Sequence, residues 1–281
     1  MRRTVLPIVC FLQLLLSAAC TPRVEPSRTG SKDFGTLPPN EPLVVLESEA
    51  SFLWNVTPSR RFPRFALYPT GLVIALSSMP SGGTYLTASL STTEVDALLQ
   101  SIDARHLPDY ADAEYVASTG VHTQSHILSV RRDDGTYAHI RVTGWLNAFP
   151  DKAPPMFPPA PLHKAMHQLF EFDLSGAATW TSEEYEIYSW PCGAGSTNAN
   201  LWPDDWPPLP REAPHAGSMW NVSRLQTGDH VRVQETLGPT INTMHREVSA
   251  RNKVWCVTYR PILPGEDKWR LVDSTPIAGA N

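Results

Sequence analysis

Residues 65–76 read FALYPTGLVIAL, and this stretch decides which kind of fold the chain can form. The apolar runs Arg64–Tyr68 and Leu72–Leu76 flank a Pro-Thr-Gly turn, and such a turn between β-prone runs is typical of a hairpin. A shorter apolar run, Leu43–Leu46, precedes the hairpin and predicts a first strand. The sequence therefore predicts an antiparallel sheet near the start of the folded part.

A second hairpin signal follows further along the chain. Asp133-Asp134-Gly135 separates the β-rich runs His126–Arg132 and Thr136–Gly144, and Asp-Gly between such runs is a strong hairpin signal. Aspartate is favoured at turns because its side chain accepts backbone hydrogen bonds. We therefore interpret Asp133 and Asp134 as turn residues and not as a catalytic pair of carboxylates.

Two amphipathic helices are predicted around the second hairpin. Residues 91–94, Ser-Thr-Thr-Glu, have the spacing of a capping box, and apolar residues then recur at helical spacing through Ile102. A second apolar stripe covers 162–170, with Pro161 near its start. The pattern predicts an α+β domain over residues 43–180, with an antiparallel sheet and two amphipathic helices.

From Trp190 onward, Trp-Pro steps and Gly, Asn and Asp dominate, which excludes a long helix there. We interpret residues 185–275 as a smaller, Trp- and Pro-rich α+β unit, either a second domain or an extension of the first. Its later part predicts strands and one short helix. The expected strands are 229–235, 253–259 and 268–272, and the expected helix is 241–248.

Residues 1–19 have the features of a secretory signal peptide. Two arginines precede an uncharged run over 4–19, which is shorter than the about 20 apolar residues that span a bilayer. The run ends in LSAAC, which resembles a bacterial lipobox, although Ser17 stands where leucine is usual. The resemblance implies that the chain is cut before Cys20 and that Cys20 is lipidated. The alternative is an ordinary signal peptide with a chance cysteine.

The same resemblance implies a location for the protein. Acyl chains on Cys20 would anchor it, since each buried CH₂ contributes about 0.8 kcal/mol. Thr21 follows, where an aspartate would favour an inner membrane, so we expect an outer-membrane lipoprotein facing the periplasm or the exterior. Residues 20–42 are rich in Pro, Ser, Gly and charge and predict a flexible tether to a water-soluble body.

The chain has four cysteines. Cys10 would leave with the signal peptide and Cys20 would carry the lipid, which leaves Cys192 and Cys256 in an oxidising compartment. Two cysteines in such a compartment most simply form one disulfide.

The composition argues against nucleic acid as a partner. The formal net charge is −5 and no basic cluster is present, whereas nucleic-acid binding depends on lysine and arginine near phosphates. We predict no cofactor, because the Gly-rich stretch after Cys192 lacks the Gly-Lys-Ser/Thr ending of a phosphate-binding loop.

Some histidines are spaced so that they could share a metal ion. His163 and His167 share one helix face, but no His-Glu-x-x-His pattern or third ligand accompanies them. His126 and His139 lie on facing strands, where a structural pair is more common. His245 fits the apolar stripe of its predicted helix. We predict no metal site.

Tryptophan is concentrated late in the chain, with seven of nine at or after residue 180. Trp202 and Trp206 could form a platform for sugar rings if both rings were exposed and coplanar, and the alternative is packing against proline. Lys253, Arg260 and Lys268 could add polar contacts. These two rings are the candidate ligand-binding residues of the sequence.

The order of FALYPTGLVIAL, LSTTEVDALLQSID, HILSVRRDDGTYAHIRV and PLHKAMHQLFEFD is similar to that in a group of uncharacterised exported bacterial proteins. The later segments YEIYSWP, WPDDWPPL and KVWCVTYRPILPGEDKW look like the second half of the same group. The resemblance covers most of residues 43–272. It implies the sheet-and-helix architecture and carries no activity.

Three classes of function remain open. The first is a non-enzymatic, lipid-anchored envelope protein whose body binds a partner protein or supports the envelope. The second is a carbohydrate- or peptidoglycan-binding module that uses Trp202 and Trp206. The third is a hydrolase that uses Cys192 or Ser196 with a histidine, which requires a free thiol or a hydroxyl near an imidazole.

Overall fold

The hairpins expected from the sequence lie in one large sheet of eight strands. The computed structural model describes residues 37–50, 60–77, 84–118, 124–144, 146, 156–174, 177–192, 199–209, 221–226, 228, 230–238 and 246–270. Cys20, the expected signal peptide and most of the expected tether lie outside these ranges.

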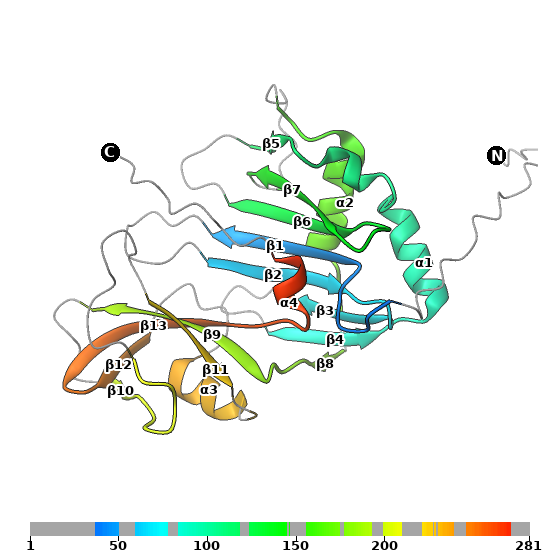
Figure 1. Cartoon of the computed structure of the whole chain (residues 1–281). Coiled ribbons are helices and arrows are strands. Elements are labelled where there is room, and N and C mark those ends of the chain that lie inside the picture. The colour runs from blue at the N-terminus through cyan, green and yellow to red at the C-terminus, as the bar shows by residue number, and fades with distance from the viewer. Residues whose placement is uncertain are drawn as a thin grey trace, which may run out of the picture. The chain divides into compact units, whose positions relative to one another are not determined.

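The large sheet places the first strand at its centre, between the two hairpins (Figure 1). In spatial order its strands are β5 (Glu114–Val116), β7 (Tyr137–Thr143), β6 (Ser125–Arg131), β1 (Val44–Ala50), β2 (Arg60–Leu67), β3 (Leu72–Leu76), β4 (Tyr85–Ser89) and β8 (Ala178–Thr179). All neighbours are antiparallel except β5 and β7, which are parallel. The expectation of an antiparallel sheet therefore needs a correction at this edge.

A second sheet of five strands forms from the later part of the chain. In spatial order its strands are β10 (Asn200–Leu201), β12 (Arg246–Ala250), β13 (Lys253–Pro261), β9 (Glu184–Pro191) and β11 (Asn221–Gln226). Again only the edge pair, β10 and β12, is parallel. Strand β13 has apolar residues on both faces and is buried along most of its length, as the sequence predicts.

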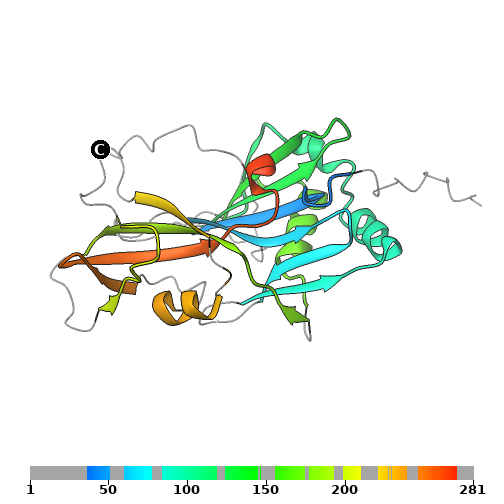
Figure 2. The ribbon, with the colours of Figure 1, turned by 60° about the horizontal axis from the view of Figure 1, so that its bottom comes forward.

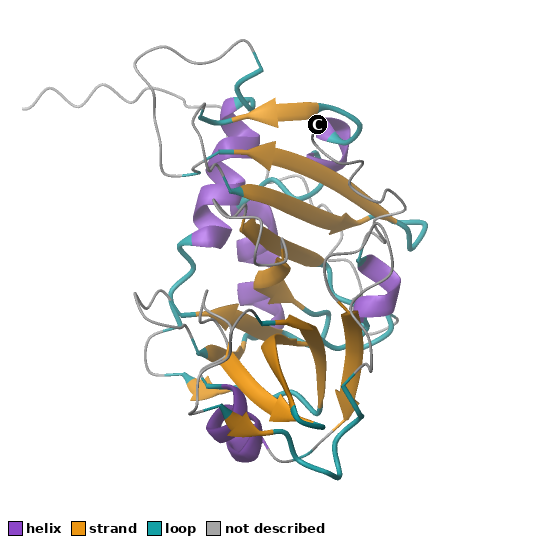
Figure 3. Cartoon of the chain, turned by 90° about the vertical axis from the view of Figure 1, so that its left-hand side faces the viewer, coloured by secondary structure: helices purple, strands orange, loops and turns teal. Residues whose placement is uncertain are grey.

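Two helices cover one face of the large sheet (Figure 3). Helix α1 (Thr92–Ser101) begins at the predicted capping box, in which Ser91 and Glu94 each accept from the other's backbone N–H. Helix α2 (Ala160–Phe170) has prolines at its start. A short 3-10 helix, Leu107–Tyr110, follows α1. Leucines and valines of the helices and strands form the largest core cluster, and the structure is compatible with the predicted α+β class.

The segment that follows strand β13 packs on the face of the large sheet opposite helices α1 and α2. After β13, Leu263 and Trp269 join a core cluster with strand residues such as Val45 and Ile74. Helix α4 (Glu266–Trp269) forms within this segment. Gly265 has a positive φ of 67°, and a Cβ there would overlap the carbonyl oxygen of Asn40. We call residues 262–270 the docking segment.

Three predictions for the second unit were wrong. Residues 230–237 form helix α3 (His230–Leu237) and not a strand, because Val233 and Leu237 are buried at i, i+4 while Val231 is exposed (Figure 2, orange helix). Val248 lies in strand β12, and the rest of the expected helix up to residue 245 is outside the described ranges. Residues 268 and 269 are helical, not extended.

In the described ranges, no helix has both the length and the hydropathy to cross a bilayer.

His126 is buried between β6 and α2. Its Nδ1 lies 2.9 Å from Ser48 Oγ, and its ring meets Phe170 edge-to-face with centroids 5.4 Å apart. Burial and the charge of Arg64 lower the pKa of this imidazole to about 4, against an opposing hydrogen bond with the Gly144 backbone. The folded protein therefore holds His126 neutral.

We predict that His126 destabilises the fold in acid. Its folded pKa lies below that of the unfolded chain, so the folded state binds fewer protons and stability is lost as the pH falls from about 6.5 to about 4. Between about pH 7 and about pH 4, the wild type should lose about 3 kcal/mol more than the His126→Gln variant. Denaturant unfolding at both pH values measures this difference.

The matched control is His106→Gln, which changes a histidine with an exposed side chain. This variant should follow the wild type at both pH values. An equal loss in the wild type and the His126→Gln variant would contradict the prediction.

Candidate functional site

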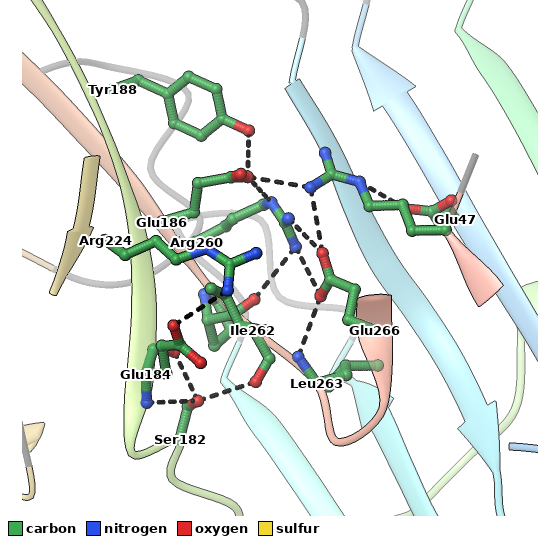
Figure 4. Close-up of polar contacts among 12 residues, drawn as sticks. Glu47, Ser182, Glu184, Glu186, Tyr188, Arg224, Arg260, Ile262, Leu263 and Glu266 are labelled. Carbon is green, nitrogen blue, oxygen red and sulfur yellow. Dashed lines mark hydrogen bonds and ion pairs between the residues drawn. The ribbon is translucent and has the colours of Figure 1, made fainter. Parts of the chain in front are cut away.

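The densest cluster of charge in the described ranges is a buried ion network between β9, β13 and the docking segment (Figure 4). Its centre is Arg260 of β13, whose side chain is almost fully buried. Strand register pairs Arg260 with Glu186 of β9, and the Arg260 Nε donates to Glu186 Oε2 at 2.6 Å. The cross-strand pair is thus set by how the two central strands align.

The other end of the Arg260 guanidinium binds Glu266 of α4. Arg260 Nη1 donates to Glu266 Oε2 at 2.9 Å, and Nη2 makes a very short contact with Oε1. The Leu263 backbone N–H also donates to Glu266 Oε2, at 3.0 Å. A planar guanidinium can bind two carboxylates in this way because its five donors have a fixed geometry. Arg260 therefore ties the strand pair to the docking segment.

Three further side chains extend the network. Arg270 Nη1 donates to Glu186 and to Glu266, at 3.1 Å in each case. Tyr188 Oη donates to Glu186 Oε2 at 2.6 Å. Glu47 of β1 approaches from the large sheet, with its Oε1 4.0 Å from Arg270 Nε. The network thus extends from the small sheet to the centre of the large one.

The electrostatics hold Glu186 and Arg260 ionised. Burial raises the pKa of Glu186, but the charges of Arg260 and Arg270 outweigh it and lower that pKa to about 2. Burial alone would lower the pKa of Arg260, but Glu266 and its hydrogen bonds raise it well above the usual value. Near neutral pH, therefore, neither group can supply or accept a proton, which fits a structural role better than acid–base catalysis.

Sequence reasoning missed this network, although it considered Arg260 as an isolated polar contact. The available signal was a charged residue within an apolar strand, as in KVWCVTYRP and VVLESEA. Charged residues are almost never fully buried unless they are paired. That rule identifies Arg260 and Glu47 as residues that need partners, but it does not name the partners.

The proposed sugar platform is wrong in the form we predicted. Trp202 is 8% exposed and Trp206 is 5% exposed, and their rings are nearly perpendicular, at 83°, with centroids 5.1 Å apart. The Trp202 Nε1 donates to the Pro207 carbonyl at 3.0 Å. Both rings belong to the core of the small sheet, because large aromatic surfaces stabilise a loop-rich unit by burial.

The cysteines pair as expected. Cys192 and Cys256 form a disulfide with a Cα–Cα distance of 5.1 Å, next to Tyr188 and Trp190. Cys192 therefore has no thiolate for catalysis, which removes the cysteine version of the hydrolase hypothesis. Ser196, its serine version, lies outside the described ranges.

The histidines are dispersed. His163 is buried with its ring centroid 5.1 Å from that of Phe157, whereas His167 is half-buried. His139 Nδ1 lies 2.9 Å from Ser129 Oγ, and strand register places His139 on the opposite sheet face from His126. His122 and His245 lie outside the described ranges. Among the residues that are described, no three His, Cys, Asp or Glu side chains are arranged around a possible metal position.

An open, mostly polar groove lies beside Trp206. Its lining residues are Glu184, Asp205, Trp206, Pro207, Arg224, Leu225 and Gln226. Ion pairs hold its walls, because Arg224 contacts Glu184 at 3.3 Å and Arg232 contacts Asp205 at 2.6 Å.

No family model, curated protein or solved structure matches this chain.

We predict that Arg260 is essential for stability. The Arg260→Met variant keeps a similar volume but leaves the carboxylates of Glu186 and Glu266 buried with fewer partners. Removing one partner of a buried ion pair costs about 3–5 kcal/mol. Denaturant unfolding near neutral pH should show a loss of this size.

Arg224→Met is the matched control, since Arg224 is 62% exposed and its pair with Glu184 is accessible to solvent. Such pairs contribute about 0–1 kcal/mol. If both variants lost equally little stability, the network would not have the role assigned to it.

We also predict that the disulfide stabilises the body. Its cysteines are 64 residues apart, and closing a loop of that length stabilises by about 4 kcal/mol in the chain-entropy model. The free energy of unfolding of a double variant, Cys192→Ala with Cys256→Ala, should be lower by this amount, as measured by denaturant unfolding. Reductant should destabilise the wild type and leave the double variant unchanged; equal responses would refute the prediction.

Proposed function

We propose that this chain is an exported lipoprotein whose acyl chains on Cys20 anchor a non-enzymatic body to the cell envelope, at the outer membrane. The body would bind a partner or support the envelope. The observation that carries the proposal is the signal-like segment 1–19, whose last residues form LSAAC together with Cys20, combined with a disulfide in the fold. A disulfide is typical of proteins that leave the reducing cytosol.

The geometry of the charged residues supports a structural or binding role. The carboxylates of Glu186 and Glu266 accept hydrogen bonds from buried arginines, so they are poor general bases. Cys192 is held in the disulfide, so it is not a nucleophile. The buried charged residues therefore stabilise the fold, and a partner would be recognised at the surface.

The surface best suited to recognition is the groove beside Trp206. Its walls carry carboxylate, guanidinium and amide groups in one open hollow, which can form hydrogen bonds to a polar partner such as a peptide or glycan. The ion pairs of Arg224 and Arg232 position these groups before binding. Glycan binding in this groove would depend on hydrogen bonds, since the Trp206 ring is almost fully buried.

We predict that Cys20→Ala abolishes membrane anchoring. The variant lacks the thiol that would carry diacylglycerol, so the body should move from the membrane fraction to the soluble fraction. Incorporation of a labelled fatty acid should fall to background, and mass spectrometry of the wild type should find acyl chains on residue 20.

Cys10→Ala is the matched control, because it removes a cysteine inside the expected signal peptide and should retain both label and membrane location. A Cys20→Ala protein that stays labelled would exclude this site of lipidation. An unmodified mature N-terminus elsewhere would do the same.

A further inference from the structure

Glu47 differs from the other acids of the ion network. It lies in the middle of β1, where a bulge shifts the register with β2, and its side chain is 1% exposed. Neither carboxylate oxygen accepts a hydrogen bond from any residue that the structure describes. A buried carboxylate without donors is strongly disfavoured when ionised, whereas the neutral acid is tolerated more easily.

The nearby arginine donors are directed elsewhere. Arg260 and Arg270 donate to Glu186 and Glu266, and Arg270 Nε stays 4.0 Å from Glu47. Arg61 Nε lies 3.9 Å from Glu49. The charged groups that act on Glu47 are Arg270 after α4, Glu266 of α4, Arg260 of β13 and Arg61 of β2. Glu49, two residues further along β1, pairs with Arg61 and Arg141.

We propose that Glu47 is a proton-controlled latch: it holds a proton while residues 262–270 are docked on the large sheet, and losing that proton weakens the docking. Docking places Glu266 and Arg270 beside Glu47 and removes its carboxyl group from water. Releasing the segment returns Glu47 to solvent, where the ionised form is stable. The reaction is a simple proton transfer from the Glu47 carboxyl group to water.

The titration of Glu47 supports the same direction. Burial and the charge of Glu266 raise the pKa of Glu47 to about 7, against the opposing charges of Arg270, Arg260 and Arg61. The docked state therefore binds more protons than the released state between about pH 4.5 and about pH 7. Docking is strongest below this window and weakens as the pH rises through it.

The docking segment is held by contacts that can report its release. Leu263 and Trp269 are buried against the large sheet, and Tyr68 Oη donates to the Pro264 carbonyl at 3.2 Å. The backbone N–H groups of Glu266, Lys268 and Arg270 donate within the segment itself. These amides are protected from exchange only while the segment keeps this structure.

The test is hydrogen exchange of the mature chain at about pH 5 and about pH 8, corrected for intrinsic exchange rates. The protection of residues 263–270, relative to the 125–143 hairpin, should fall about 70-fold in the wild type, which is the ratio for a pKa of about 7 when docked and 4.5 when released. Glu47→Gln mimics the protonated acid, so its protection should stay constant. Equal changes in both proteins overturn the proposal.

Glu184→Gln is the matched control, because it neutralises a partly exposed carboxylate whose partner is Arg224. This variant should show the wild-type fall in protection. If Glu47→Gln does not fold, the carboxyl carbon resonance of Glu47 in the wild type gives an independent answer. A midpoint near pH 7 supports the latch, and a midpoint near pH 4.5 overturns it.

Discussion

The guanidinium of Arg260 is buried and binds two carboxylates from different parts of the chain at once. It binds Glu186 on the neighbouring strand and Glu266 on α4, so one planar side chain ties the aligned strands β9 and β13 to the docking segment. An ammonium group could not replace it, because a lysine lacks the flat, forked set of donors. Once such a charge is buried, every alternative arrangement that leaves it unpaired becomes costly.

This constraint acts together with the covalent one. The disulfide links Cys192, just after β9, to Cys256 within β13, and Arg260 pairs with Glu186 further along the same two strands. The pair of strands is therefore fixed at two points, one covalent and one electrostatic. The aromatic side chains of Tyr185 and Tyr259 fill the core beside them, with ring centroids 5.7 Å apart.

Local patterns predicted the elements that form from nearby residues. The capping box at Ser91 and the Asp-Gly turn at Gly135 specify their structures within a few positions, and both are present. Helix α3 was misread because the alternation of Val231 and Val233 mimics a strand, while burial of Leu237 against the small sheet decides for a helix. Tertiary packing overrode the local period in that case.

The ion network could not be read from the sequence, because its members are far apart along the chain and carry no common motif. The sequence indicates that Arg260 and Glu47 interrupt apolar strands. Only the fold shows that Arg260 binds Glu266 and that Glu47 has no hydrogen-bond donor among the described residues. The tryptophan platform failed for a related reason. A Trp-Pro-rich segment is compatible with an exposed or a buried loop, and the neighbouring sheet determines which occurs.

Glu47 and His126 are buried groups of the large sheet whose pKa values are shifted in opposite directions. His126 weakens the fold as acid is added, whereas Glu47 weakens it as acid is removed. Between about pH 5 and about pH 7 the two effects largely compensate. A flat stability profile in this range would therefore reflect two opposing titrations and not an absence of them.

The close approach of Gly265 to Asn40 has a mechanical consequence. The chain enters the folded body at residues 37–43, and there its backbone lies directly against the turn that begins the docking segment. A pulling force applied to the chain ahead of residue 37 would be transmitted to this turn and to the centre of the large sheet through β1. The entry of the chain into the body and the turn of the docking segment are therefore mechanically coupled where the first and last described segments meet.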